Sequence, residues 1–370
     1  MVLWILEIIA FMAVLFVVQI PLRKKGAPAL KVIIFVLKIL LIPAAALFFV
    51  AIVNPVTYRH SDIFAAVYIA LIADVCAGIA EYVIRRFLQG KDKRAGECSY
   101  RLIRIGVLNA VFCLCIFVYG FVNAGHVREN KHVWTCEGVT QEHTFAFAPD
   151  LHIGSARSIK ILKEFCRQVN DAAPEFVILG GDVTDELTSY EDMRTAYRLL
   201  SEIDAPVFYI YGNHDRQPDA SFFGGRTYSD EQLERTIREA GIIILSDQFV
   251  RPTDDLTLLG REDVSMEKKR AAWSDLVNPF QETGTLIVAD HQPYDKEQLA
   301  TEESALQLSG HTHAGQLWPL QIVYRMLGLP AYGEFEEPGT LLYVSAGTGV
   351  WSMPLRTEAH CEWELITLVP

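Results

Sequence analysis

Four long apolar stretches occupy most of the first 124 residues of this chain. They cover residues 2–20, 30–53, 63–84 and 102–122. An α-helix needs about 20 apolar residues to cross the hydrocarbon core of a membrane. The pattern therefore predicts an N-terminal transmembrane region of four helices over residues 1–124.

The charges of the chain are divided as unevenly as its apolar residues. Residues 1–124 contain 13 Lys and Arg against six Asp and Glu, whereas the remaining residues contain 20 against 39. The acidic part excludes a nucleic-acid binder, which needs a basic surface. Most basic residues between the stretches lie in the first and third loops, and the positive-inside rule places such loops in the cytoplasm. We therefore expect an integral multi-pass protein of the cell membrane, in which the apolar anchor is followed by an extracytoplasmic domain.

Two ionisable residues, Lys38 and Asp74, lie deep within the predicted spans. Ionisable groups in an apolar medium need a partner or mark a functional site. Two interpretations stay open: the residues pair with each other, or they line a groove for a lipid headgroup.

After residue 124, short apolar runs alternate with amphipathic stretches. The runs at 176–179, 207–211, 286–289 and 341–345 have strand composition, and the stretches at 158–170, 189–202 and 229–240 have helical periodicity. Ser229, with Gln232 three residues later, resembles a capping box. We expect a linker and a first strand over 125–143, then a large α/β domain over 144–370.

Five apolar runs of this domain end in loops that carry Asp, Asn or His. The polar residues of these loops are Asp150, His152, Asp182, Asp185, Asn213, His214, Asp215, Asp290, His291, His311 and His313. Strand ends of layered α/β folds meet at one edge, so these side chains should share one cleft. Residues i and i+2 of an extended segment project to the same side, which lets Asp150 and His152 share a metal ion. Mixed imidazole and carboxylate ligands suit Mn, Fe, Zn or Co.

The ordered motifs resemble the signature of the calcineurin-like metallophosphoesterases over about 60% of the chain. They are Asp150-x-His152, Gly181-Asp182-x-x-Asp185, Gly212-Asn213-His214-Asp215, His291 and Gly310-His311-x-His313. The run from Gly310 to Gln316 and the segment 345–349 are similar to the bacterial membrane-associated phosphodiesterase branch. The resemblance implies a four-layer α/β/β/α sandwich metallophosphoesterase domain with two divalent metal ions.

The same resemblance implies a role for each motif residue. One ion would be held by Asp150, His152, Asp182 and His313, and the other by Asp182, Asn213, His291 and His311. A hydroxide that bridges the two ions would attack phosphorus. His214 would stand near the leaving oxygen, and Asp215 either orients its imidazole or stabilises the turn.

These observations predict a membrane-anchored dinuclear-metal phosphohydrolase, a phosphodiesterase for a lipid or lipid-linked phosphoester. Its partners would be that substrate and membrane lipid, without nucleic acid. The alternatives are a lipid-linked pyrophosphatase, a nucleotide or protein phosphatase, and a vestigial metal-binding membrane scaffold or sensor. Residues 317–329 either pack in the core or form an amphipathic element that touches the bilayer.

Two cysteines, Cys136 and Cys361, lie near the two ends of the acidic domain. In an oxidising compartment they could form a disulfide, and otherwise they are free thiols.

Overall fold

The computed structural model describes residues 33, 36–40, 61–88, 107–136, 138–154, 157–216, 227–266, 270–280, 284–293, 305–337 and 340–370. The chain divides into two compact units. The first comprises Met1–Val122 with Leu317–Val323, and the second comprises Asn123–Gln316 with Tyr324–Pro370.

The first unit contains helix α4 (Ser61–Leu88) and nearly all of helix α6 (Val107–Asn123). Lys38 is 1% exposed and forms an ion pair with Asp74 of α4. Asn109 of α6 donates a hydrogen bond of 3.1 Å to the same carboxylate. Of the two interpretations left open, the structure shows the pairing of Lys38 with Asp74, which gives a buried charge the partner that burial requires.

The predicted transmembrane region is wrong for the part of the chain that the structure describes, because none of its helices is both long and apolar enough to cross a membrane. Helix α6 is described over 17 residues, and residues 102–106 of the fourth predicted span lie outside the described residues. The same finding in the described residues contradicts the prediction of an integral multi-pass protein, on which the extracytoplasmic placement of the domain depended. The predicted span 2–20, and all of 30–53 except residues 33 and 36–40, lie outside the described residues.

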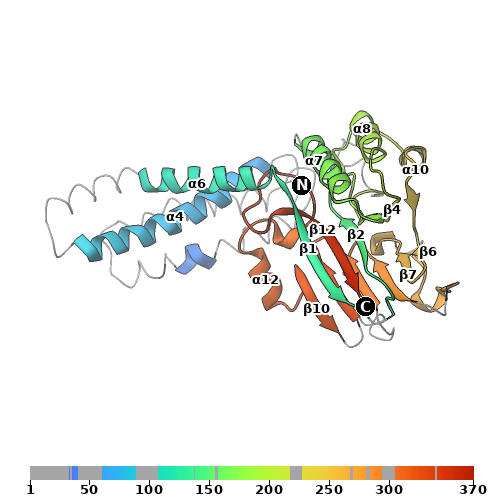
Figure 1. Cartoon of the computed structure of the whole chain (residues 1–370). Coiled ribbons are helices and arrows are strands. Elements are labelled where there is room, and N and C mark those ends of the chain that lie inside the picture. Colours follow the sequence, from blue (N-terminus) through green and yellow to red (C-terminus); the bar gives the residue numbers. More distant parts are fainter. Residues whose placement is uncertain are drawn as a thin grey trace. The chain divides into compact units, whose positions relative to one another are not determined.

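The second unit contains two six-stranded sheets (Figure 1). The first sheet has the order β1 (Val127–Thr135), β12 (Cys361–Val369), β2 (His143–Ala148), β3 (Val177–Leu179), β4 (Val207–Tyr209) and β5 (Ile243–Ile244). The second has the order β10 (Gly333–Glu337), β11 (Thr340–Val344), β9 (Ala305–Ser309), β8 (Thr285–Ala289), β7 (Leu256–Gly260) and β6 (Gln248–Thr253). Neighbouring strands are parallel except in the pairs β12–β2, β10–β11 and β6–β7.

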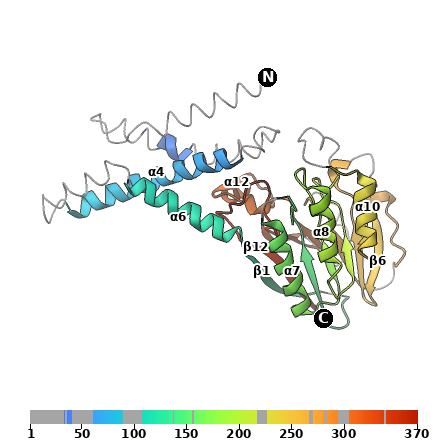
Figure 2. The same ribbon diagram turned by 90° about the horizontal axis from the view of Figure 1, so that it is seen from above.

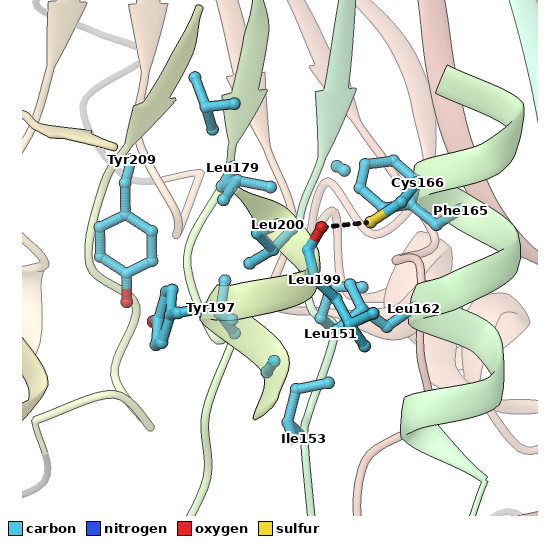
Figure 3. Close-up of a cluster of buried hydrophobic side chains, with 14 of the residues drawn as sticks. Leu151, Ile153, Leu162, Phe165, Cys166, Leu179, Tyr197, Leu199, Leu200 and Tyr209 are labelled. Atoms are coloured by element: carbon cyan, nitrogen blue, oxygen red, sulfur yellow. Dashed lines mark hydrogen bonds between the residues drawn. The ribbon is translucent and has the colours of Figure 1, made fainter. Parts of the chain in front are cut away.

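Three helices cover one face of the first sheet: α7 (Ser158–Ala172), α8 (Tyr190–Leu200) and α10 (Asp230–Glu239) (Figures 1 and 2). Each has an apolar stripe, and these stripes pack on the sheet in one buried cluster. Figure 3 shows part of this cluster, where the Cys166 thiol of α7 donates to the carbonyl oxygen of Leu199 in α8 at 3.6 Å. The predicted helices and strands of this domain are thus present.

The alternation of side chains along β2 explains why two cores form. Ala146 and Ala148 face the helices, whereas Phe145 and Phe147 face the second sheet and pack in the core between the sheets. The α/β sandwich expected from the resemblance is therefore present.

The outer face of the second sheet carries a smaller apolar cluster. There Leu259 and Val288 pack with Trp273 of the 3₁₀ helix η2 (Trp273–Asp275). In the described residues, this cluster is covered by a 3₁₀ turn where the four-layer expectation places an α-helix. A second 3₁₀ helix, η1 (Val264–Met266), precedes it.

The structure decides one open alternative and bears on a second. Cys136 and Cys361 are free thiols, and the Cys361 thiol contacts the carbonyl oxygen of Gly349 at 3.5 Å. In the segment 317–329, which includes α12 (Leu320–Met326), Leu320 is buried but Met326 is 81% exposed. Core packing therefore accounts for only part of that segment.

Candidate metal centre

Two groups of three ligand side chains, all buried except the half-buried His311, lie beyond the carboxyl ends of the strands. One consists of Asp150, His152 and His313, and the other consists of Asp182, His291 and His311. Within each group the ligand atoms lie within 4.8 Å of one another, which is close enough for one metal ion to bind all three. Parallel strands bring these loops together because their carboxyl ends share one edge.

Asp182 lies close to both groups. Its Oδ2 is 3.0 Å from Nε2 of His291 and 3.8 Å from Nε2 of His152. Nε2 of His152 lies 3.1 Å from Nε2 of His313. This arrangement agrees with the predicted bridging position of Asp182 between two ions.

The backbone is strained at the predicted ligands. Five of them have a positive φ: Asp150 (59°), His152 (45°), Asp182 (52°), His311 (72°) and His313 (51°). Non-glycine residues rarely adopt this conformation, and such strain concentrates at functional sites. Turning the chain sharply at the end of each strand directs the ligands toward a common point.

Asn213, the predicted seventh ligand, presents a side-chain oxygen, Oδ1, that is buried and has no hydrogen-bond partner within the described ranges. The backbone N–H of His214, which follows it, donates to Oδ1 of Asp182 at 2.8 Å. An unsatisfied buried oxygen in the residue before His214 is what an amide ligand of a metal would present. The donor set of carboxylate, imidazole and amide groups thus fits two divalent ions.

Burial keeps two of the imidazoles neutral, which is the form that binds metal. Burial and the nearby His291 lower the pKa of His311 to about 4. Burial, together with the positive charges of His152 and Arg356, holds the pKa of His313 well below its usual value.

The side chain that orients His214 is Glu186, not Asp215. Oε1 of Glu186 lies 2.6 Å from Nδ1 of His214, and Glu186 is 1% exposed. Although burial lowers the pKa of His214, the carboxylates of Asp182 and Glu186 raise it to about 9. The contact with Glu186 thus favours the protonated imidazole, which is the form that can act as an acid.

Asp215 instead stabilises the loops that carry the ligands. Its carboxylate accepts backbone hydrogen bonds from Asp182 (2.8 Å), Gly212 (2.8 Å) and Thr184 (2.9 Å). Of the two roles predicted for Asp215, these contacts support the stabilisation of the turn.

Two residues at the centre are absent from the predicted set, Glu186 and Arg356. Glu186 directly follows the Gly-Asp-x-x-Asp motif, and its position in that loop is a signal that could have indicated it. Arg356 is fully buried, its guanidinium lies 3.2 Å from Nδ1 of His313, and it donates to the carbonyl oxygens of Ala346 and Gly349. Arg356 lies 43 residues after His313, and no local pattern marks it.

Asp290, which precedes the ligand His291, pairs with Arg270 at 2.7 Å. The ion pair neutralises a carboxylate that is fully buried beside the centre.

Residues 143–315 match the family described as calcineurin-like phosphoesterase. The chain is similar to an uncharacterized metallophosphoesterase of Helicobacter pylori, with 28% identity over 60% of this chain and 58% of the relative. It is similar to a zebrafish (Danio rerio) transmembrane protein with metallophosphoesterase domain, with 26% identity over 71% and 62% of the two chains. It is also similar to the phosphodiesterase YaeI of Escherichia coli, with 26% identity over 55% and 74%. The matched region spans less than two thirds of the first two relatives.

Proposed function

We propose that this chain, which carries a calcineurin-like phosphoesterase domain over residues 143–315, is a metal-dependent phosphodiesterase. The observation that carries the proposal is the pair of three-residue ligand groups with Asp182 close to both. The similarity to the phosphodiesterase YaeI supports a diester as the substrate.

The residues divide into two ion-binding sets. Asp150, His152 and His313 would hold one ion, and His291, His311 and Asn213 would hold the second, with Asp182 shared between them. Mn, Fe, Zn or Co suits this donor set. Two such ions, when bound, supply an activated water and neutralise the charge on the phosphoryl oxygens.

His214 would provide the proton that the leaving group needs. The carboxylate of Glu186 contacts Nδ1 of the imidazole. This contact orients the ring and stabilises its protonated form. As the bond between phosphorus and the leaving oxygen breaks, the imidazolium would transfer its proton to that oxygen.

The physiological substrate is a separate part of the proposal. We propose a small phosphoester rather than nucleic acid, because acidic residues outnumber basic residues 39 to 20 after residue 124 and would repel a polyanion. A lipid-linked phosphoester remains within this class, although the transmembrane region that favoured it is not supported.

The proposal is tested by loading the purified full chain with Mn²⁺ and measuring hydrolysis of three substrates. These are bis(4-nitrophenyl) phosphate, 4-nitrophenyl phosphate and a polyprenyl diphosphate. We expect preferential turnover of the diester, loss of activity with chelator, and loss of bound metal in Asp182→Asn. A protein that binds two ions but hydrolyses none of the three substrates would contradict the enzymatic function.

A further inference from the structure

Trp351 lies beside His214 in the second unit. The two ring centroids are 5.7 Å apart, and the ring planes are inclined by 44°. Trp351 is partly exposed, whereas its neighbours Val350 and Met353 are 1% and 2% exposed. An accessible indole therefore adjoins the imidazole that we expect at the leaving oxygen.

The position of Trp351 is tied to the loop that carries the metal ligands. The side-chain oxygen of Gln316 accepts the backbone N–H of Trp351 at 3.1 Å, and the side-chain amide donates to the Trp351 carbonyl oxygen at 3.0 Å. Gln316 is 6% exposed and directly follows the 3₁₀ helix η3 (His313–Gly315), which begins at the ligand His313. Two hydrogen bonds with one buried amide thus fix the backbone of Trp351 beside the loop that carries His313.

Arg216, the basic residue nearest to His214 in the sequence, is already engaged. Its guanidinium pairs with Glu262 and lies 3.5 Å above the centroid of the Tyr211 ring. Arg216 is thus neutralised by contacts within the protein and is poorly available to receive a departing anion.

We propose that Trp351 forms a wall of the leaving-group side of the centre and selects an uncharged, planar leaving group over a phosphate. This inference rests on the proposed function, which places the leaving oxygen at His214. An indole face stacks on planar rings and excludes water. It provides no counter-charge for the phosphate anion that hydrolysis of a pyrophosphate would release. The substrate class is therefore an aryl or nucleoside phosphodiester.

The test compares two methyl phosphodiesters whose leaving groups have similar acidity but different shape, one phenyl and one hexafluoroisopropyl. With the Mn²⁺-loaded full chain, Trp351→Ala should raise KM for the phenyl ester about tenfold, because stacking on the indole is lost. KM for the fluoroalkyl ester should stay within about twofold, and Trp351→Phe should restore most of the difference.

Trp134→Phe is the matched control, since Trp134 lies in β1 and its ring contacts His132 and Tyr343. We expect it to leave both KM values unchanged, and we expect bound metal to be equal in all variants. Equal effects of Trp351→Ala on both esters, or no effect on either, would overturn the inference while leaving the proposed function intact. Faster hydrolysis of a phenyl-capped pyrophosphate than of the phenyl diester by the unaltered chain would also overturn it. Absence of any ester hydrolysis would overturn the proposed function and this inference together.

Discussion

Close contact between glycines and ligand residues sets the geometry of the centre at the residue scale. Gly347 has a φ of +89°, and a Cβ atom placed on it would lie 2.8 Å from Cβ of Asp150. The carboxylate of Asp150 also accepts a hydrogen bond of 3.0 Å from the backbone N–H of His311. Any side chain at position 347 must therefore displace a predicted metal ligand.

Replacing Gly347 with alanine should weaken metal binding as well as stability. The left-handed backbone alone costs about 1–2 kcal/mol for a residue with a Cβ atom, and the collision with Asp150 adds to this cost. Gly241→Ala is the matched control, because Gly241 has a φ of +77° and a Cβ atom added there would meet no other atom within 4 Å. Titration with Mn²⁺ should show weaker binding in Gly347→Ala only, while chemical denaturation should show destabilisation in both. Unchanged Mn²⁺ affinity in Gly347→Ala would contradict the expected contact.

The pair formed by Glu186 and His214 yields a second prediction at this scale. His214→Ala should keep its bound metal but lose about 10²- to 10⁴-fold in kcat on a diester with an alkoxide leaving group. Glu186→Gln should lose activity in the same direction, because the imidazolium then lacks its buried carboxylate. A diester with a good leaving group, which needs little protonation, should be affected much less. Full activity of His214→Ala on the alkyl diester would exclude the acid role.

At the scale of single elements, side-chain hydrogen bonds mark where helix α10 begins. The hydroxyl of Ser229 accepts the backbone N–H of Gln232 at 3.3 Å, and the Gln232 side chain accepts the Ser229 N–H at 2.9 Å. The capping box predicted from the sequence is therefore confirmed. Local patterns succeed here because both partners lie within one helical turn.

Ser229→Ala should lower the free energy of unfolding by about 1 kcal/mol, because the N-terminal N–H groups of α10 lose their acceptor. Ser201→Ala, at the carboxyl end of α8, provides a comparison in which no helix start is altered. Urea denaturation followed by circular dichroism measures both changes. If both substitutions lowered the free energy of unfolding equally, the capping box would make no specific contribution to stability.

At the scale of the whole second unit, a charged histidine connects the two sheets. His143 begins β2 in the first sheet, and Nε2 of its ring lies 2.5 Å from Oδ1 of Asp255, which directly precedes β7 of the second sheet. Its Nδ1 lies 2.9 Å from Glu175. Although burial lowers the pKa of His143, the hydrogen bonds and charges of Glu175 and Asp255 raise it above its usual value.

The stabilisation from His143 should therefore depend on pH. Because the folded-state pKa is raised, the contribution is complete below the unfolded pKa of about 6.5 and is lost as the pH rises through the folded-state value. His143→Gln should lower the free energy of unfolding by about 2 kcal/mol at pH 5, because hydrogen bonds to charged groups are lost. The decrease should be smaller at alkaline pH. The exposed His126 provides the control His126→Gln. A loss in His143→Gln that does not change with pH would contradict the charged state.

The sequence by itself predicted the ligand motifs and the helices α7, α8 and α10. It also predicted the order in which polar loops follow the strands. Each depends on periodicity or on residues close together in the chain, which physical chemistry relates directly to local structure. It was misleading for the apolar stretches, because none of the helices in the described part of the chain is both long and apolar enough to cross a membrane.

Only the tertiary structure decided which distant residues surround the centre. The sheet places β12 between β1 and β2, and the segment before β12 brings Arg356 to His313 and Trp351 to His214. The tertiary structure also shows that Glu186, rather than Asp215, contacts the imidazole of His214. These contacts depend on strand order and on the direction of side chains after folding. Neither property is encoded in the spacing of residues along the chain.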